Sequence, residues 1–127
     1  MSNCFKENSK IMDHFFRPRN MGVIENSDAM GEVGNPMCGD IMHIYLKIKD
    51  NIIKDIKFKT YGCAVAIAST SVLTELVKGK SLKEAEKISS KRIREVLGDM
   101  PVHKYHCTIL AEQSLKSAIE DYRKKHD

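Results

Sequence analysis

Apolar and polar side chains alternate without interruption over residues 42–49, a period of two that predicts a half-buried β-strand. The apolar positions are Met42, Ile44, Leu46 and Ile48. The dipeptide Asp50-Asn51 then supplies residues that favour a tight turn, and a second alternating segment follows it over residues 52–59. The pattern therefore predicts an antiparallel hairpin whose apolar face must be covered by other elements.

The remaining apolar positions mostly recur at helical spacing of three and four residues. The segments that predict helices are 8–16, 64–78, 81–88, 90–98 and about 108–124, with Ser90 expected to cap the fourth. Residues 20–34 carry no sustained period and are expected to form a loop or an edge strand. The order of elements predicts an α+β fold, in which a small antiparallel sheet of about three strands is covered on one face by helices, including an N-terminal helix and a long C-terminal helix.

Composition limits the size of the fold. The chain of 127 residues falls within the usual range of one domain, so we expect a single domain over residues 1–127, with residues 1–7 as a flexible tail. Aromatic residues make up only 6% of the chain and tryptophan is absent, so the core should consist of aliphatic side chains. A core of this kind is small, and a bound metal could add materially to its stability.

Charge and hydropathy exclude several classes of function. The net charge is +4, but lysine and arginine are scattered among acidic residues, so no basic face for nucleic acid is expected. The longest apolar run is the six-residue segment 63–68, and no secretory signal precedes the fold, so neither membrane insertion nor export is expected. We expect a cytoplasmic protein, in which the four cysteines are metal ligands, reactive thiols or core residues rather than disulfides.

Three cysteines fall at junctions between the predicted elements. Cys38 lies in a glycine- and proline-containing loop before the first strand of the hairpin, and Cys4 lies in the polar N-terminal segment. Cys63 and Cys107 stand at the predicted N-termini of two helices. Unpaired amide groups at a helix N-terminus stabilise thiolate over thiol, and thiolate is the form that binds metals and attacks sulfur.

Two further donors lie close to these cysteines in the sequence, Asp40 two residues after Cys38 and His106 directly before Cys107. Thiolates combined with one oxygen or nitrogen ligand suit Zn(II), Fe(II) or an iron–sulfur cluster. Spacing alone leaves alternatives open, because the chain contains no CxxC pair. The three cysteines could also be buried core residues, or one could be a nucleophilic thiol.

Several segments resemble the IscU family and the N-terminal domain of NifU, and the similarity runs from about residue 8 to residue 124. The segments that carry it are Asp13-His14-Phe15 through Asn20-Met21-Gly22, Gly34-Asn35-Pro36-Met37-Cys38-Gly39-Asp40, Thr60-Tyr61-Gly62-Cys63-Ala64, Ala66-Ile67-Ala68-Ser69-Thr70-Ser71, Val77-Lys78-Gly79-Lys80 and His106-Cys107-Thr108-Ile109-Leu110-Ala111-Glu112. The resemblance implies a non-enzymatic scaffold that assembles a 2Fe-2S cluster from iron and sulfur and transfers it to acceptor proteins.

The resemblance also implies roles for individual residues. Cys38, Cys63 and Cys107 match the cluster cysteines, Asp40 matches a labile ligand, and His106 matches a ligand in some states. The implied partners are a cysteine desulfurase that delivers persulfide sulfur, with Cys107 as its acceptor, an electron donor such as a ferredoxin, cluster acceptors and, in the loaded state, a second copy of the chain. Fe(II) enters during assembly, and Zn(II) is expected to bind the same ligands.

Two departures from the family pattern bear on the partners. Family members commonly carry Leu-Pro-Pro-Val-Lys where this chain has Met100-Pro101-Val102-His103-Lys104, so recognition by an Hsp70-type chaperone is left open. The zinc-containing SufU relatives carry an insertion between the second and third cysteine regions and a basic residue in place of His106. This chain has neither mark, which favours the IscU type over SufU. A zinc-stabilised sulfur acceptor and a small thiol enzyme stay open as rival functions.

Overall fold

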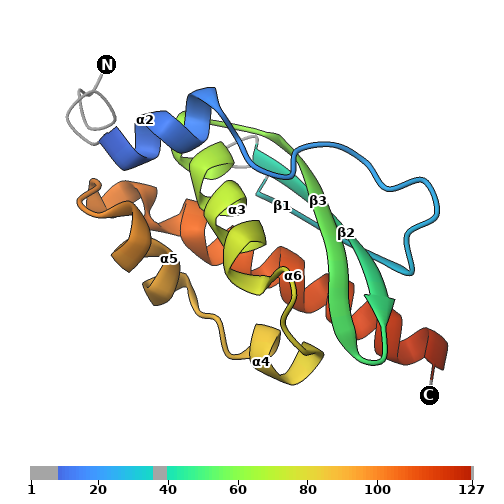
Figure 1. Ribbon diagram of the computed structural model, residues 1–127. Helices are drawn as coiled ribbons and strands as arrows, with labels where there is room; N and C mark the ends of the chain where they lie inside the picture. The colour runs from blue at the N-terminus through green and yellow to red at the C-terminus, as the bar shows by residue number, and fades with distance from the viewer. Residues whose placement is uncertain (1–8, 36–39, 127) are drawn as a thin grey trace.

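The computed structural model describes residues 9–35 and 40–126 (Figure 1). In chain order the elements are α2 (Ser9–Phe16), β1 (Ala29–Asn35), β2 (Asp40–Lys49), β3 (Ile52–Tyr61), α3 (Ala64–Val77), α4 (Leu82–Glu86), α5 (Ser90–Leu97), the 3-10 turn η1 (Val102–Lys104) and α6 (Tyr105–His126). Cys4, Cys38 and the expected tail of residues 1–7 lie outside the described residues. In the described part of the chain, no helix is long and apolar enough to cross a membrane.

The three strands form one antiparallel sheet in the order β1-β2-β3, so the predicted hairpin is its central and one outer strand. Asp50 and Asn51 join β2 to β3 with φ angles of 57° and 61°. Two successive residues with positive φ are typical of the two-residue turn whose twist matches that of paired strands. Residues 20–34 were expected to form a loop or an edge strand, and the last part of this segment belongs to the edge strand β1.

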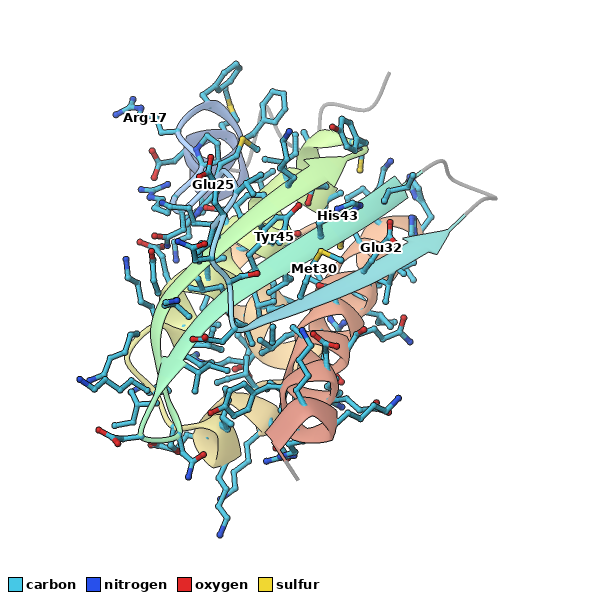
Figure 2. All side chains as sticks on the ribbon, turned by 90° about the vertical axis from the view of Figure 1, so that its right-hand side faces the viewer. Arg17, Glu25, Met30, Glu32, His43 and Tyr45 are labelled. Atoms are coloured by element: carbon cyan, nitrogen blue, oxygen red, sulfur yellow. The ribbon has the colours of Figure 1, made fainter. Side chains whose placement is uncertain are left out.

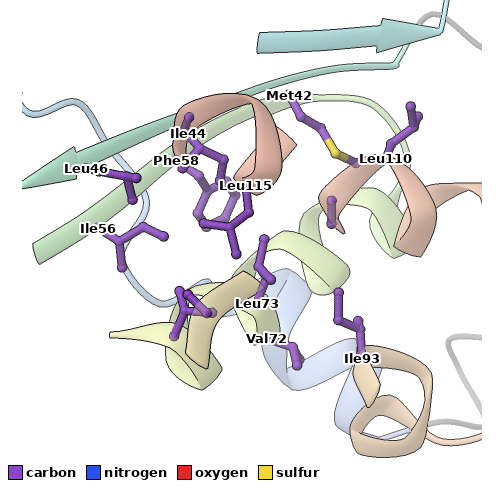
Figure 3. Packing of buried hydrophobic residues seen from close by; sticks show 14 of the residues in the cluster. Met42, Ile44, Leu46, Ile56, Phe58, Val72, Leu73, Ile93, Leu110 and Leu115 are labelled. Atoms are coloured by element: carbon purple, nitrogen blue, oxygen red, sulfur yellow. The ribbon is translucent and has the colours of Figure 1, made fainter. Parts of the chain in front are cut away.

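One face of the sheet is buried under the helices. Met42, Ile44 and Leu46 of β2 and Phe58 of β3 have no exposed surface, and they pack with residues of α3 and α6 such as Leu73 (Figure 3). The opposite face is open, and Figure 2 shows Met30, Glu32, His43 and Tyr45 along it. The α+β prediction, with helices on one face of a three-stranded sheet, is confirmed.

Strand β1 lies directly against the backbone of α6 at Gly31. A Cβ atom at this position would be 2.4 Å from the carbonyl oxygen of Ser114 and 2.4 Å from the amide nitrogen of Ala118. The amide of Met30 also donates a hydrogen bond of 3.0 Å to Oδ2 of Asp121 in α6. These contacts fix α6 to the sheet edge, and so they also help to fix the position of its first turn.

Most predicted helix ends are confirmed. Helix α3 ends just before Gly79, which has a φ of 85°, and α4 opens with a capping box between Ser81 and Glu84. The predicted cap of α5 at Ser90 is wrong by one residue, because the side chain of Ser89 accepts the hydrogen bond from the Arg92 amide.

The predicted start of the C-terminal helix near Thr108 is also wrong, because α6 begins at Tyr105. The turn η1 runs directly into α6, and the hydroxyl of Thr108 donates a hydrogen bond of 2.7 Å to the carbonyl of Tyr105. Thr108 thus bonds back inside the helix instead of capping it. As a consequence His106 and Cys107 belong to the first turn of α6.

Candidate functional site

Cys63 occupies the N-cap position of α3, where β3 ends. Its backbone is extended, with φ −79° and ψ 173°, and its carbonyl oxygen accepts the hydrogen bond from the Ile67 amide at 3.2 Å. The side chain makes no capping hydrogen bond and is only partly buried. The Cys63 thiol therefore lies at the surface end of α3, beside the unpaired amides of its first turn.

This environment lowers the pKa of Cys63 to about 5. The largest cause is a hydrogen bond from the Cys107 thiol, which outweighs the opposing effect of burial, and the amides of Ala66 and Val65 and the charge of Lys104 act in the same direction. Each of these groups stabilises the anionic sulfur. The pKa of Cys63 is thus lowered in the direction predicted for a cysteine at a helix N-terminus, although the largest cause is the neighbouring thiol and not the helix.

Cys107 lies in the first turn of α6, and its Sγ atom is 3.6 Å from Sγ of Cys63. The two sulfur atoms come from residues 44 positions apart, so the fold brings together two of the three predicted cluster cysteines. Cys107 has no exposed area, whereas Cys63 is only partly buried.

His106 adds a nitrogen donor beside the thiol pair. Its Nδ1 lies 2.9 Å from the carbonyl oxygen of His103, which can only accept, so Nδ1 carries the proton. In the neutral ring Nε2 then has a lone pair, and this atom is 3.6 Å from Sγ of Cys107. Histidines that bind metals characteristically donate the other ring N–H to a carbonyl or a carboxylate in this way.

Asp40 is the first residue of β2, at the same end of the sheet. It pairs with Asn35 of β1, and the next residue of β2, Ile41, pairs with Tyr61, two residues before Cys63. The backbone of Asp40 is thereby placed near the β3–α3 junction, while its side chain lies outside the description. Cys38 belongs to residues 36–39, between Asn35 and Asp40, and also lies outside the described residues.

Among the side chains that the structure describes, which exclude those of Cys38 and Asp40, no group of three or more His, Cys, Asp or Glu is arranged to hold a metal ion. The described part of the site is a thiolate–thiol pair with an imidazole at its edge. Such a pair can bind a thiophilic metal together with further ligands, or it can undergo thiol–disulfide chemistry. The described geometry therefore supplies up to three of the five predicted donors.

Sequence reasoning missed two groups that tune this site. The carbonyl of His103 fixes the tautomer of His106, and the charge of Lys104 favours the Cys63 thiolate. The His103 contact depends on how η1 leads into the first turn of α6, which brings the His103 carbonyl to 2.9 Å from the ring atom Nδ1 of His106. The helix start predicted near Thr108 lies three residues after Tyr105 and so gives no signal for this contact.

Comparisons with known proteins agree with the fold and identify the family. The family model of the NifU-like N terminal domain matches residues 6–127. The iron–sulfur cluster assembly scaffold protein IscU 1 of Archaeoglobus fulgidus is 54% identical over 92% of this chain and 76% of its own length. IscU of Escherichia coli K12 is 50% identical over 93% of this chain and 94% of its own length.

Solved structures show the same arrangement of elements. A candidate iron–sulfur cluster assembly scaffold protein for the SUF system of Fervidobacterium islandicum superposes with a TM-score of 0.77 at 27% identity, covering 93% of this chain and 99% of that one. The N-terminal NifU-like protein of Brucella abortus shares the fold, with a TM-score of 0.74 at 22% identity over 93% and 94% of the two chains. From the family match and the sequence identities, the chain belongs to the NifU-like N-terminal domain family, together with the IscU proteins.

Proposed function

We propose that this protein is a scaffold on which a 2Fe-2S cluster is assembled on Cys38, Cys63 and Cys107 and from which the cluster passes to acceptor proteins. The observation that carries the proposal is the 3.6 Å approach of the Cys63 and Cys107 sulfur atoms, made by two helix N-termini at one end of the sheet. The cluster is cargo that the scaffold receives and releases. The protein is therefore a carrier rather than an enzyme.

The chemistry of the donors supports this cargo. Iron–sulfur clusters are held by cysteine thiolates, and their stability depends on hydrogen bonds to sulfur and on solvent exposure. Cys63 is held as a thiolate at neutral pH by its neighbours, so no large cost of deprotonation opposes iron binding at this sulfur. Fe(II) and Zn(II) both suit these ligands, so zinc in the isolated protein would be a competitor at the same site.

Cys107 is proposed to accept persulfide sulfur from a cysteine desulfurase, after which electrons from a donor such as a ferredoxin reduce that sulfur to sulfide. Because the Cys107 side chain is buried, delivery to it requires the first turn of α6 to open, or transfer through the more exposed Cys63. Peptide mass spectrometry after incubation with a desulfurase and cysteine distinguishes these routes. Persulfide that is found only on Cys38 would exclude both.

Either Asp40 or His106 is proposed to fill the remaining coordination position. His106 presents Nε2 toward the thiol pair, and Asp40 begins β2 at the same end of the sheet. A carboxylate is a harder ligand than thiolate and matches cluster iron less well, so oxygen at this position would leave the cluster transferable. Asp40→Ala should then lengthen the half-life of the cluster absorbance in air, and a shorter half-life would assign Asp40 to holding the loop.

Anaerobic reconstitution tests the scaffold proposal against its main rival, a zinc-bound sulfur acceptor that never carries a cluster. The protein is incubated with Fe(II), cysteine and a desulfurase, and visible absorbance, iron and acid-labile sulfide are measured after removal of excess reagents. The scaffold proposal expects equal amounts of iron and sulfide and a cluster spectrum, and sizing of the loaded protein shows whether two chains share one cluster. Zinc as the sole bound metal, with no labile sulfide, would support the rival.

A further inference from the structure

Arg94 of α5 makes two side-chain contacts that bracket the His106–Cys107 dipeptide. Its guanidinium carbon lies 4.5 Å from the centroid of the Tyr105 ring, and its Nη1 donates a hydrogen bond of 3.0 Å to the hydroxyl of Thr108. Tyr105 directly precedes the dipeptide and Thr108 directly follows it. One side chain thus contacts both neighbours of the residues that form the α6 half of the site.

The contacts of Arg94 form a closed set. The Thr108 hydroxyl accepts from Arg94 and donates in turn to the Tyr105 carbonyl at 2.7 Å, while the guanidinium covers the Tyr105 ring. A planar guanidinium can stack flat on a ring while its N–H groups donate sideways in the same plane, a geometry that the compact ammonium group of lysine lacks. Helix α5, which lies beside the start of α6 in Figure 1, is held to α6 a turn further along by the Ser90 amide and Glu112. The first turn of α6 is therefore fixed from outside the helix.

We propose that Arg94 is a positioning residue for the site. By holding Tyr105 and Thr108 it sets the direction of the first turn of α6, and this direction aims the Cys107 sulfur at Cys63. Reaction between two groups depends steeply on such placement, since a displacement of about 1 Å can cost about 100-fold in rate. Arg94 places the thiol pair whatever the pair is used for. That the pair then holds a cluster rests on the proposed function.

The test uses the full chain with Cys4→Ser and Cys38→Ser, so that only the thiol pair remains. Diamide is added at constant pH; it accepts two electrons and two protons as the Cys63–Cys107 disulfide closes, and the rate is followed by mass spectrometry. Arg94→Ala should slow closure by about tenfold or more and should speed alkylation of the buried Cys107. Arg92→Ala is the matched control, because Arg92 is an exposed residue of the same helix whose side chain pairs with Glu95 at 3.6 Å.

Each contact is then removed singly, by Tyr105→Leu and by Thr108→Val, which also decides the matter if Arg94→Ala does not fold. Each should slow closure less than Arg94→Ala, and Arg94→Lys should restore only part of the rate. Closure in Arg94→Ala as fast as in Arg92→Ala, or faster, would overturn the proposal, even if the melting temperature falls. Because closure needs no cluster, the two proposals fail separately: a failure of the chain with all four of its cysteines to load iron and sulfide would count against the proposed function alone.

Discussion

The two helix N-termini that carry the thiol pair differ in how they hold their cysteine. Cys63 is the N-cap of α3, partly exposed and surrounded by amides and a lysine that stabilise its thiolate. Cys107 lies within the first turn of α6, fully buried, in a turn that residues of α5 hold from outside. One terminus therefore provides a reactive sulfur at the surface, and the other provides a sulfur whose position is controlled by packing. A labile cargo needs both, because access permits loading and packing defines where the cargo sits.

The largest effect is expected from removing either sulfur. Cys63→Ala and Cys107→Ala should each abolish stable cluster loading, because each removes one thiolate ligand from a site that has few. Iron and acid-labile sulfide per chain after reconstitution measure the loss, with Cys4→Ala as the control that should load normally. Full loading of Cys63→Ala would show that α3 contributes no ligand and that α6 and the Cys38 loop hold the cluster.

Packing away from the site should matter more for α6 than for α3. Gly31→Ala places a Cβ against the α6 backbone and should cost about 3 kcal/mol of unfolding free energy, because the atoms it meets at 2.4 Å cannot move independently. Gly79→Ala, after the end of α3, meets nothing within 4 Å and should cost only about 1 kcal/mol for its positive φ. Urea unfolding measures both, and equal costs would contradict the close approach of β1 to α6.

The reactivity of the two thiols should differ with pH. In the Cys4→Ser, Cys38→Ser background, alkylation of Cys63 should be nearly constant at neutral pH and fall only as the pH approaches its pKa of about 5. Cys107→Ala should raise this pKa, because the Cys107 hydrogen bond is the largest cause of the shift. Alkylation rates measured by mass spectrometry over a range of pH give the pKa of Cys63. An unchanged pKa in Cys107→Ala would show that the hydrogen bond from Cys107 does not lower it.

A smaller effect is expected where α2 packs on α3. Burial, with the charge of Arg19, lowers the pKa of His14 below 6.5, and Nδ1 of this ring lies 2.8 Å from Oγ of Ser71. The folded state therefore favours neutral His14, and its contribution to stability is present above pH 6.5 and lost as the pH falls below it. Urea unfolding above and below this pH should show the loss in wild type and a smaller one in His14→Gln. An equal loss of stability in wild type and His14→Gln would show that a group other than His14 causes the pH dependence.

Local patterns predicted the elements of this fold because they depend on neighbours in the sequence. The alternation over residues 42–49, the Asp50-Asn51 turn and the Ser81–Glu84 capping box each report a short-range preference, and all are present. Edge strand β1 could not be predicted with the same clarity, because Gly31 is there for its approach to α6, more than eighty residues along the chain.

The site could be predicted only in part for the same reason. Cys63 and Cys107 carry recognisable motifs, but their approach, the burial of Cys107 and the contacts of Arg94 depend on how α3, α5 and α6 pack. The start of α6 was also hard to predict, because the Thr108 hydroxyl bonds to a carbonyl within the helix instead of capping it, and residue type alone does not reveal this. The roles of Cys38 and Asp40 stay predictions from the resemblance to the IscU family.

Differential alkylation of cluster-free and cluster-loaded protein decides whether the Cys63 thiolate holds the cluster. Cys107 is buried, so the decisive thiol is the partly exposed Cys63, which should react rapidly when the scaffold carries no cluster. The account predicts that loading protects Cys63 and Cys38 from the reagent, that protection is lost as the cluster absorbance decays, and that Cys4 reacts equally in both forms. A Cys63 that reacts at the same rate in fully loaded and empty protein would contradict the assignment of this thiolate to the cluster.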